Sequence, residues 1–138
     1  MAEGLSFGPL PPTTRHLCID MQRLFAPDGP WPTPWMDRVL PVVAGMIGHD
    51  PARTIFTRFI PPEKPEDMAG SWRRYYTRWQ DKTRAWLDPA CLELLPALAG
   101  YVPPAVVFDK PVYSALAGRR LPEHLAAQAI DTLVVTGS

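Results

Sequence analysis

Two oppositely charged residues, Asp109 and Lys110, stand at the end of a short apolar segment and are the clearest chemical signal in the chain. The segment consists of Val106, Val107 and Phe108, and β-branched and aromatic residues bounded by prolines are typical of a buried strand. An open α/β sheet places its ligands and reacting groups at the carboxyl ends of its strands. The pattern therefore predicts a catalytic role for Lys110.

A second carboxylate, Asp20, ends the first apolar segment. Alternating apolar residues over 16–22 predict a strand with Asp20 near its carboxyl end. Because the carboxyl ends of parallel strands meet at one edge of a sheet, we expect Asp20 and Lys110 to lie together there. Two simpler interpretations compete: Asp20 could cap the following turn, and Lys110 could pair only with Asp109.

Strands and helical segments alternate along the chain. The strands are expected at 16–22, 54–59, 105–108 and 131–137, and the helices at 34–48, 89–95 and 121–130. Thr33 is expected to cap the first helix, with Pro34 at its first position. The order predicts an α/β fold, a Rossmann-like three-layer α/β/α sandwich with a mostly parallel sheet. The last strand is so apolar that we expect it in the centre of the sheet.

Composition restricts the classes of partner. The 14 basic and 14 acidic residues balance, so no overall field attracts nucleic acid or a membrane. No apolar segment approaches the ~20 residues that cross a bilayer, and the start of the chain lacks the apolar core of a signal peptide. We therefore expect a soluble, cytoplasmic protein, with residues 1–15 as an N-terminal arm and 16–138 as one domain.

The segment from Trp72 to Trp79 is both aromatic and basic, which allows two interpretations. Aromatic rings can stack on bases while arginines bind phosphates, so the segment could bind single-stranded nucleic acid. Balanced charge and a single short patch argue against this function. The alternative is a surface helix or lid whose aromatic side chains pack over a pocket.

Four segments together resemble the isochorismatase-like cysteine hydrolase family. They read Cys-Ile-Asp-Met-Gln-Arg-Leu-Phe (18–25), Ile-Phe-Thr-Arg-Phe (55–59), Phe-Asp-Lys-Pro-Val-Tyr-Ser-Ala-Leu (108–116) and Asp-Thr-Leu-Val-Val-Thr-Gly-Ser (131–138). The resemblance covers most of residues 16–138. It implies a three-layer α/β sandwich and an Asp–Lys–Cys catalytic group, in which Asp20 matches the aspartate and Lys110 the lysine.

The family's cysteine lies a few residues beyond the position that matches Ser138, so we expect the nucleophile after residue 138 and the sheet to be incomplete at its C-terminus. Cys18 and Cys91 do not match that position. The implied chemistry follows from the residue types. The aspartate takes the thiol proton, the lysine favours both anions, and the thiolate attacks an amide-like carbonyl.

The resemblance is to the amidohydrolase branch, because residues 57–61 lack the Asp-x-His metal motif of the nicotinamidases. We therefore expect no metal and no cofactor. The implied substrate is a small amide, urea or carbamate. Candidate substrate-binding residues are Phe25, Arg58, Trp79 and Tyr113, although Arg58 could equally anchor a loop.

Two other functions stay open. A truncated, inactive relative could act through oligomeric or partner association. The resemblance also implies a homo-oligomer, because family members commonly form oligomers. A cysteine-independent enzyme of the isochorismatase type could cleave a vinyl ether by protonation from Asp20.

Overall fold

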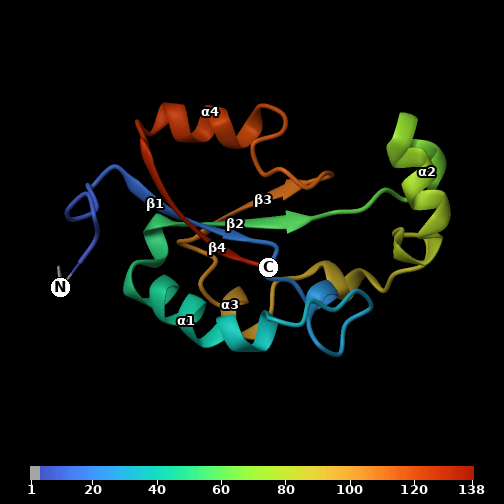
Figure 1. The fold of residues 1–138 in the computed structure, drawn as a ribbon, viewed down its shortest axis with the longest axis horizontal. Coiled ribbons are helices and arrows are strands. Elements are labelled where there is room, and N and C mark those ends of the chain that lie inside the picture. Colours follow the sequence, from blue (N-terminus) through green and yellow to red (C-terminus); the bar gives the residue numbers. More distant parts are fainter. Residues whose placement is uncertain (1–3) are drawn as a thin grey trace.

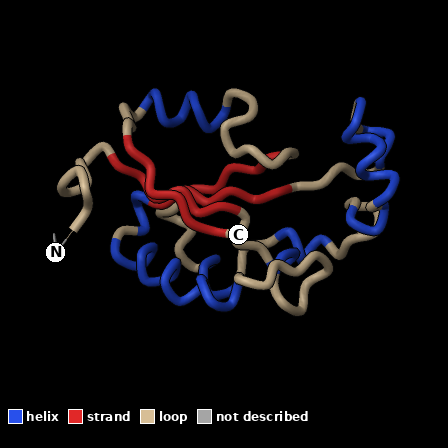
Figure 2. The backbone as a smooth tube through the Cα atoms, viewed as in Figure 1, coloured by secondary structure: helices blue, strands red, loops and turns tan. Residues whose placement is uncertain are grey.

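The computed structural model describes residues 4–138 and shows a parallel sheet with helices on both faces (Figure 1). The elements are β1 Thr14–Ile19, α1 Met36–His49, β2 Thr54–Phe59, α2 Gly70–Arg78, α3 Pro96–Ala99, β3 Val106–Lys110, α4 Arg120–Ala127 and β4 Thr132–Gly137. Short 3-10 helices and loops make up most of the long connection between β2 and β3 (Figure 2). The expected three-layer α/β architecture is confirmed.

The four strands are hydrogen-bonded in the order β3-β2-β1-β4, and every pair is parallel. Helix α4 covers one face of the sheet, and α1 and α3 cover the other (Figure 1). Helix α2 lies beyond the carboxyl end of β2 and covers neither face. All four strands thus direct their carboxyl ends to one edge, which is where the candidate residues are found.

Both faces of the central strands are buried, because successive side chains point to opposite sides. Cys18 and Phe56 pack against Val43 and Ile47 of α1. The neighbouring residues on each strand, Leu17 and Ile55, pack against Leu121 of α4 and the residues around it. This double burial explains why consecutive apolar residues occur in both strands, Leu17-Cys18-Ile19 in β1 and Ile55-Phe56 in β2.

The first helix differs from the prediction at its start. It begins at Met36 with Trp35 at the N-cap, rather than at Pro34 after a Thr33 cap. The Thr33 hydroxyl is engaged elsewhere, since it hydrogen-bonds Phe25 O and Ser138 Oγ. Tertiary partners therefore outweigh the local capping preference. The first strand also begins two residues earlier than expected, at Thr14.

Among the described residues, the two apolar strands β3 and β4 lie at the two edges of the four-stranded sheet. Val106 of β3 is 37% exposed and Val135 of β4 is 62% exposed. The strand order places β1 and β2 in the centre instead. The apolar composition of a strand does not determine its place in the sheet, because the crossover connections set the order of the strands.

Candidate active site

Asp20 and Lys110 form a buried ion pair at the carboxyl edge of the sheet. Lys110 Nζ donates to Asp20 Oδ2 at 2.8 Å, and the two side chains are 5% and 13% exposed. Asp20 directly follows β1 and Lys110 is the last residue of β3, so β2 lies between them. The expectation that these two residues meet is confirmed.

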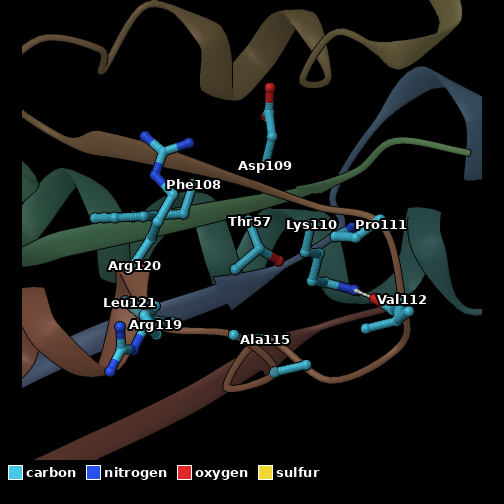
Figure 3. Close-up of a pocket in the computed structure, with 12 residues that line it drawn as sticks. Thr57, Phe108, Asp109, Lys110, Pro111, Val112, Ala115, Arg119, Arg120 and Leu121 are labelled. Atoms are coloured by element: carbon cyan, nitrogen blue, oxygen red, sulfur yellow. Dashed lines mark hydrogen bonds between the residues drawn. The ribbon is translucent and has the colours of Figure 1, made fainter.

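The turn after β3 supplies the remaining partners of the ammonium. Lys110 Nζ also donates to Val112 O at 3.1 Å and to Tyr113 O at 2.9 Å (Figure 3 draws the Val112 bond). An ammonium has three protons, and all three are therefore engaged. Lys110 is a fixed positive charge beside Asp20.

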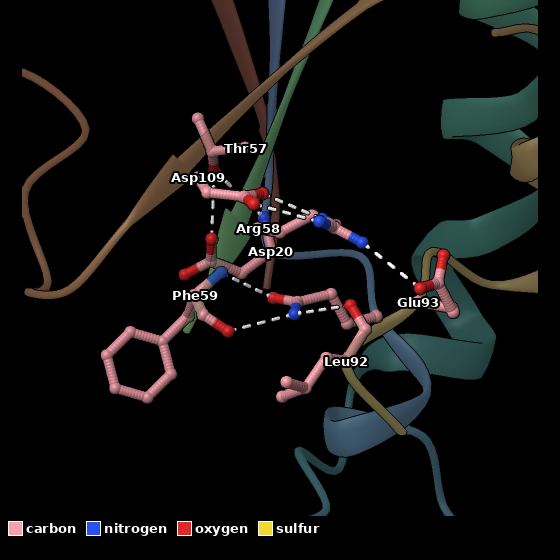
Figure 4. A network of polar contacts seen from close by, with 8 residues as sticks. Asp20, Thr57, Arg58, Phe59, Leu92, Glu93 and Asp109 are labelled. Carbon is pink, nitrogen blue, oxygen red and sulfur yellow. Dashed lines mark hydrogen bonds and ion pairs between the residues drawn. The ribbon is translucent and has the colours of Figure 1, made fainter. Parts of the chain in front are cut away.

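Asp109 does not pair with Lys110, so that interpretation is wrong. Its carboxylate accepts two bonds from Arg58, from Nε at 2.7 Å and from Nη2 at 2.8 Å (Figure 4). Consecutive residues in a strand point to opposite faces, which separates Asp109 from Lys110.

Thr57 is the third member of the site. Its Oγ1 donates to Asp20 Oδ1 at 2.8 Å, and the side chain is 1% exposed. The Asp20 carboxylate is therefore held by Thr57 and Lys110, and the interpretation that it caps the local turn is wrong. Sequence reasoning overlooked Thr57; the available signal was a hydroxyl residue directly after the apolar pair Ile55-Phe56, near the carboxyl end of the strand.

Burial controls the protonation of the acidic groups near the site. Desolvation raises the pKa of Asp20 above its ordinary value, while hydrogen bonds and charge from Lys110 and a bond from Thr57 oppose the rise. Such a carboxyl is suited to exchanging a proton nearer neutral pH than an exposed aspartate. Burial also raises the pKa of the Cys18 thiol to about 12, so Cys18 is a core residue and no thiolate.

A cavity of about 260 Å³ adjoins Lys110 and Thr57 (Figure 3). Its apolar wall includes Phe108, Ala115 and Leu121, contributed by β3, the following loop and α4. The volume lies just below the usual range of ligand pockets and suits a small molecule.

Aromatic side chains form a continuous cluster next to the ion pair. The ring of Phe59 lies 5.6 Å from Lys110 Nζ and 6.3 Å from the ring of Phe25. From Phe25 the cluster continues through Trp31 to Trp79, with ring centroids 6.3 Å and then 6.2 Å apart. The predicted residues Phe25 and Trp79 thus lie in one cluster, and Trp31, which sequence reasoning missed, joins them.

Tyr113 and helix α2 extend this cluster. The Tyr113 hydroxyl donates to Tyr75 Oη at 3.2 Å, and the Tyr75 ring stacks on Trp31 at 6.3 Å. Tyr113 is 64% exposed, and its carbonyl holds Lys110. Most of the segment from Trp72 to Trp79 belongs to α2, and the rings of Tyr75 and Trp79 pack against Trp31 of the cluster.

Arg58 lies on the other face of the sheet from Thr57. Besides Asp109, its Nη1 bonds Glu93 Oε1 at 3.3 Å (Figure 4). The pKa of Arg58 is raised, mainly by the hydrogen bond to Asp109. These partners favour the anchoring interpretation of Arg58 over substrate binding.

A model of the isochorismatase domain matches residues 14–138. The chain belongs to the isochorismatase family. A solved cysteine hydrolase of Pseudomonas syringae pv. phaseolicola 1448A is 25% identical, with a TM-score of 0.76 and coverage of 100% of this chain and 65% of that one. An isochorismatase family protein of Desulfovibrio vulgaris subsp. vulgaris str. Hildenborough is 21% identical, with a TM-score of 0.71 and coverage of 91% and 67%.

The N-carbamoylsarcosine amidase of Thermoplasma acidophilum shares the fold as well, at 22% identity and a TM-score of 0.63, with coverage of 90% of this chain and 66% of that one. This isochorismatase-family chain thus spans 65–67% of the length of these proteins. No curated protein matches it in sequence.

Among residues 4–138, no group of three or more His, Cys, Asp and Glu side chains is arranged to hold a metal ion. Within the same residues, no helix is long and apolar enough to span a membrane.

Proposed function

We propose that this protein hydrolyses C–N bonds in small amides, ureas or carbamates, with Asp20 and Lys110 as catalytic residues. The observation that supports the proposal best is the buried ion pair, in which Lys110 Nζ lies 2.8 Å from Asp20 Oδ2. The family includes hydrolases of this kind, among them the N-carbamoylsarcosine amidase. A buried carboxyl beside a fixed positive charge is suited to repeated proton transfer.

In the proposed mechanism the Asp20 carboxylate accepts the proton of a cysteine thiol, and Lys110 stabilises the resulting charges. The thiolate attacks the carbonyl carbon, the C–N bond breaks, and Asp20 returns the proton to the leaving nitrogen. Water then hydrolyses the acyl-enzyme. The proposal assigns the thiol to residues after Ser138, and Ser138 N donates to Ile19 O at 3.1 Å, so a group carried just after β4 would start beside Asp20.

The test measures ammonia release from simple amides, ureas and carbamates by the protein translated from the complete reading frame. We expect Asp20→Asn and Lys110→Met each to lower kcat/KM by about 10³-fold, the usual range for loss of a general acid–base group. Asp50→Asn is the control, because Asp50 pairs with Arg53 at the opposite end of the strands. Activity of Asp20→Asn close to that of the wild type would refute the mechanism.

The same assay separates the thiol mechanism from the cysteine-independent one. Alkylation by iodoacetamide should abolish amide hydrolysis if a thiol is the nucleophile. Vinyl-ether cleavage that survives alkylation but is lost in Asp20→Asn would replace the amidase assignment with protonation by Asp20.

A second candidate function is association with another chain. It rests on β4, which lies at an edge of the sheet formed by the described residues and whose Val135 is 62% exposed there. Exposed edge strands with apolar side chains favour pairing between chains. Light scattering should then report a dimer or larger species that Val135→Lys dissociates; a monomer at high concentration would exclude this candidate.

A further inference from the structure

The Thr57 hydroxyl lies between the backbone and the side chain of Asp20. Oγ1 is 2.8 Å from Asp20 Oδ1 and 3.3 Å from Asp20 N. The same backbone N–H also reaches Thr57 O at 3.2 Å. Thr57 therefore makes three hydrogen-bond contacts with two atoms of Asp20, N and Oδ1.

The direction of each bond follows from the chemistry of the partners. An ionised carboxylate only accepts and a backbone N–H only donates, so the Thr57 hydroxyl must donate to Oδ1 and accept from Asp20 N. A valine could do neither. A serine could do both, but threonine is stiffer about χ1 because it is β-branched.

Asp20 needs such support because its backbone is unusual. Its φ is +53°, in the left-handed region that non-glycine residues seldom occupy. Residues held in such conformations persist only where the surroundings enforce them. Thr57 is well placed to enforce this one, since it lies in the central strand β2 in register with Ile19, the residue before Asp20.

We infer that Thr57 is the positioning residue of Asp20, and that it sets both the orientation of the carboxylate and the ease with which it ionises. Lys110 binds Oδ2 and Thr57 binds Oδ1, so the plane of the carboxylate is held at both oxygens. The other titratable group facing Asp20 is Cys18 of β1, whose thiol stays neutral. The catalytic part of this inference rests on the proposed function, whereas the part that concerns ionisation does not.

The decisive measurement is the ionisation of Asp20 in Thr57→Val, followed by ¹³C NMR of the carboxyl carbon. A hydrogen bond to a charged group favours ionisation, so its loss should raise the pKa of Asp20 by about one unit or more. In the full-length enzyme the acid limb of kcat/KM should move up with it, and kcat should fall by about tenfold to a hundredfold. Thr57→Ser should restore most of both effects.

Thr54→Val is the matched control. Thr54 lies in the same strand and is also 1% exposed, but its hydroxyl donates to Asp50 O at 3.3 Å and has no contact with Asp20. A destabilised sheet would affect both variants alike, whereas positioning affects Thr57→Val alone. An unchanged Asp20 titration in Thr57→Val, or an equal change in Thr54→Val, would overturn the inference. If neither the wild type nor any variant hydrolyses a substrate, the proposed function fails. The NMR titration of Asp20 still decides the inference about Thr57.

Discussion

Asp20 and Lys110 differ in how much hydrogen-bonding capacity they retain for a substrate. All three protons of Lys110 are bound by protein oxygens, so this residue cannot hold a substrate without breaking a bond. Each oxygen of Asp20 receives one donor and retains a lone pair. Of the two, Asp20 is the one able to exchange a proton during turnover.

The raised pKa of Asp20 predicts the pH dependence of activity. A general base works only when it is deprotonated, so kcat/KM should fall on the acid side with a midpoint above ~3.9, the ordinary value for aspartate. Stability should change with pH in the opposite direction to activity. The contribution of Asp20 to the free energy of unfolding is greatest below its unfolded pKa and is lost as the pH rises through its folded pKa. A pH–rate profile checks the statement about activity, and an acid midpoint at or below ~3.9 would contradict it.

Lys110→Met should destabilise the fold more at neutral than at acid pH. The variant leaves a buried carboxylate without its opposite charge, which typically costs about 3 kcal/mol or more. Protonation of Asp20 removes that charge, so the loss should shrink as the pH falls. Urea unfolding at both pH values measures the difference, and an equal loss at each would contradict the argument.

At the scale of the elements, Gln22 joins three segments near the site. Its side chain is fully buried, accepts from Phe59 N at 2.7 Å, and donates to Phe59 O at 3.0 Å and Leu92 O at 2.9 Å. The amide therefore ties the chain after β1 to the end of β2 and to the connection that precedes β3. It keeps the carboxyl edge of the sheet in one arrangement.

Gln22→Leu should reduce the free energy of unfolding by about 3 kcal/mol, since it leaves two buried backbone groups and one partly buried backbone group without their partner. Urea denaturation measures the loss. Gln128→Leu is the control, because Gln128 is exposed and its change should stay within about 0.5 kcal/mol. A loss in Gln22→Leu as small as in the control would show that the amide does not join these segments.

At the scale of the whole molecule, β4 and β1 approach each other closely at their carboxyl ends, next to Asp20. Gly137 pairs with Ile19, and its φ of +122° is accessible mainly to glycine. A Cβ at this position would lie 2.1 Å from Ile19 O. The two strands can meet just before Asp20 only because residue 137 has no side chain.

Gly137→Ala should therefore destabilise the fold by about 3 kcal/mol, from backbone strain together with the clash. Gly45→Ala is the contrasting variant, because Gly45 lies inside α1 with nothing within 4 Å of the added Cβ. That substitution should be neutral or stabilising by up to about 1 kcal/mol. Thermal or urea unfolding compares the two, and equal effects would refute the close approach.

The sequence by itself determined the layered α/β fold and the meeting of Asp20 with Lys110. Apolar segments separated by helical ones predict parallel strands, and the carboxyl ends of parallel strands share an edge whatever their order. The short 3-10 helix Pro89–Leu92, which begins where the helix at 89–95 was expected to begin, was also local enough to predict. These features depend on periodicity and on residues close together in the chain.

Only the tertiary structure decided the strand order, the start of α1 and the partners of each charge. Strand order follows from crossovers between distant segments, which place β1 between β2 and β4 in the sheet of the described residues. The pairing of Arg58 with Asp109, and of Thr57 with Asp20, joins residues 51 and 37 positions apart. Such contacts depend on which strands lie side by side, and no local pattern in the sequence encodes that.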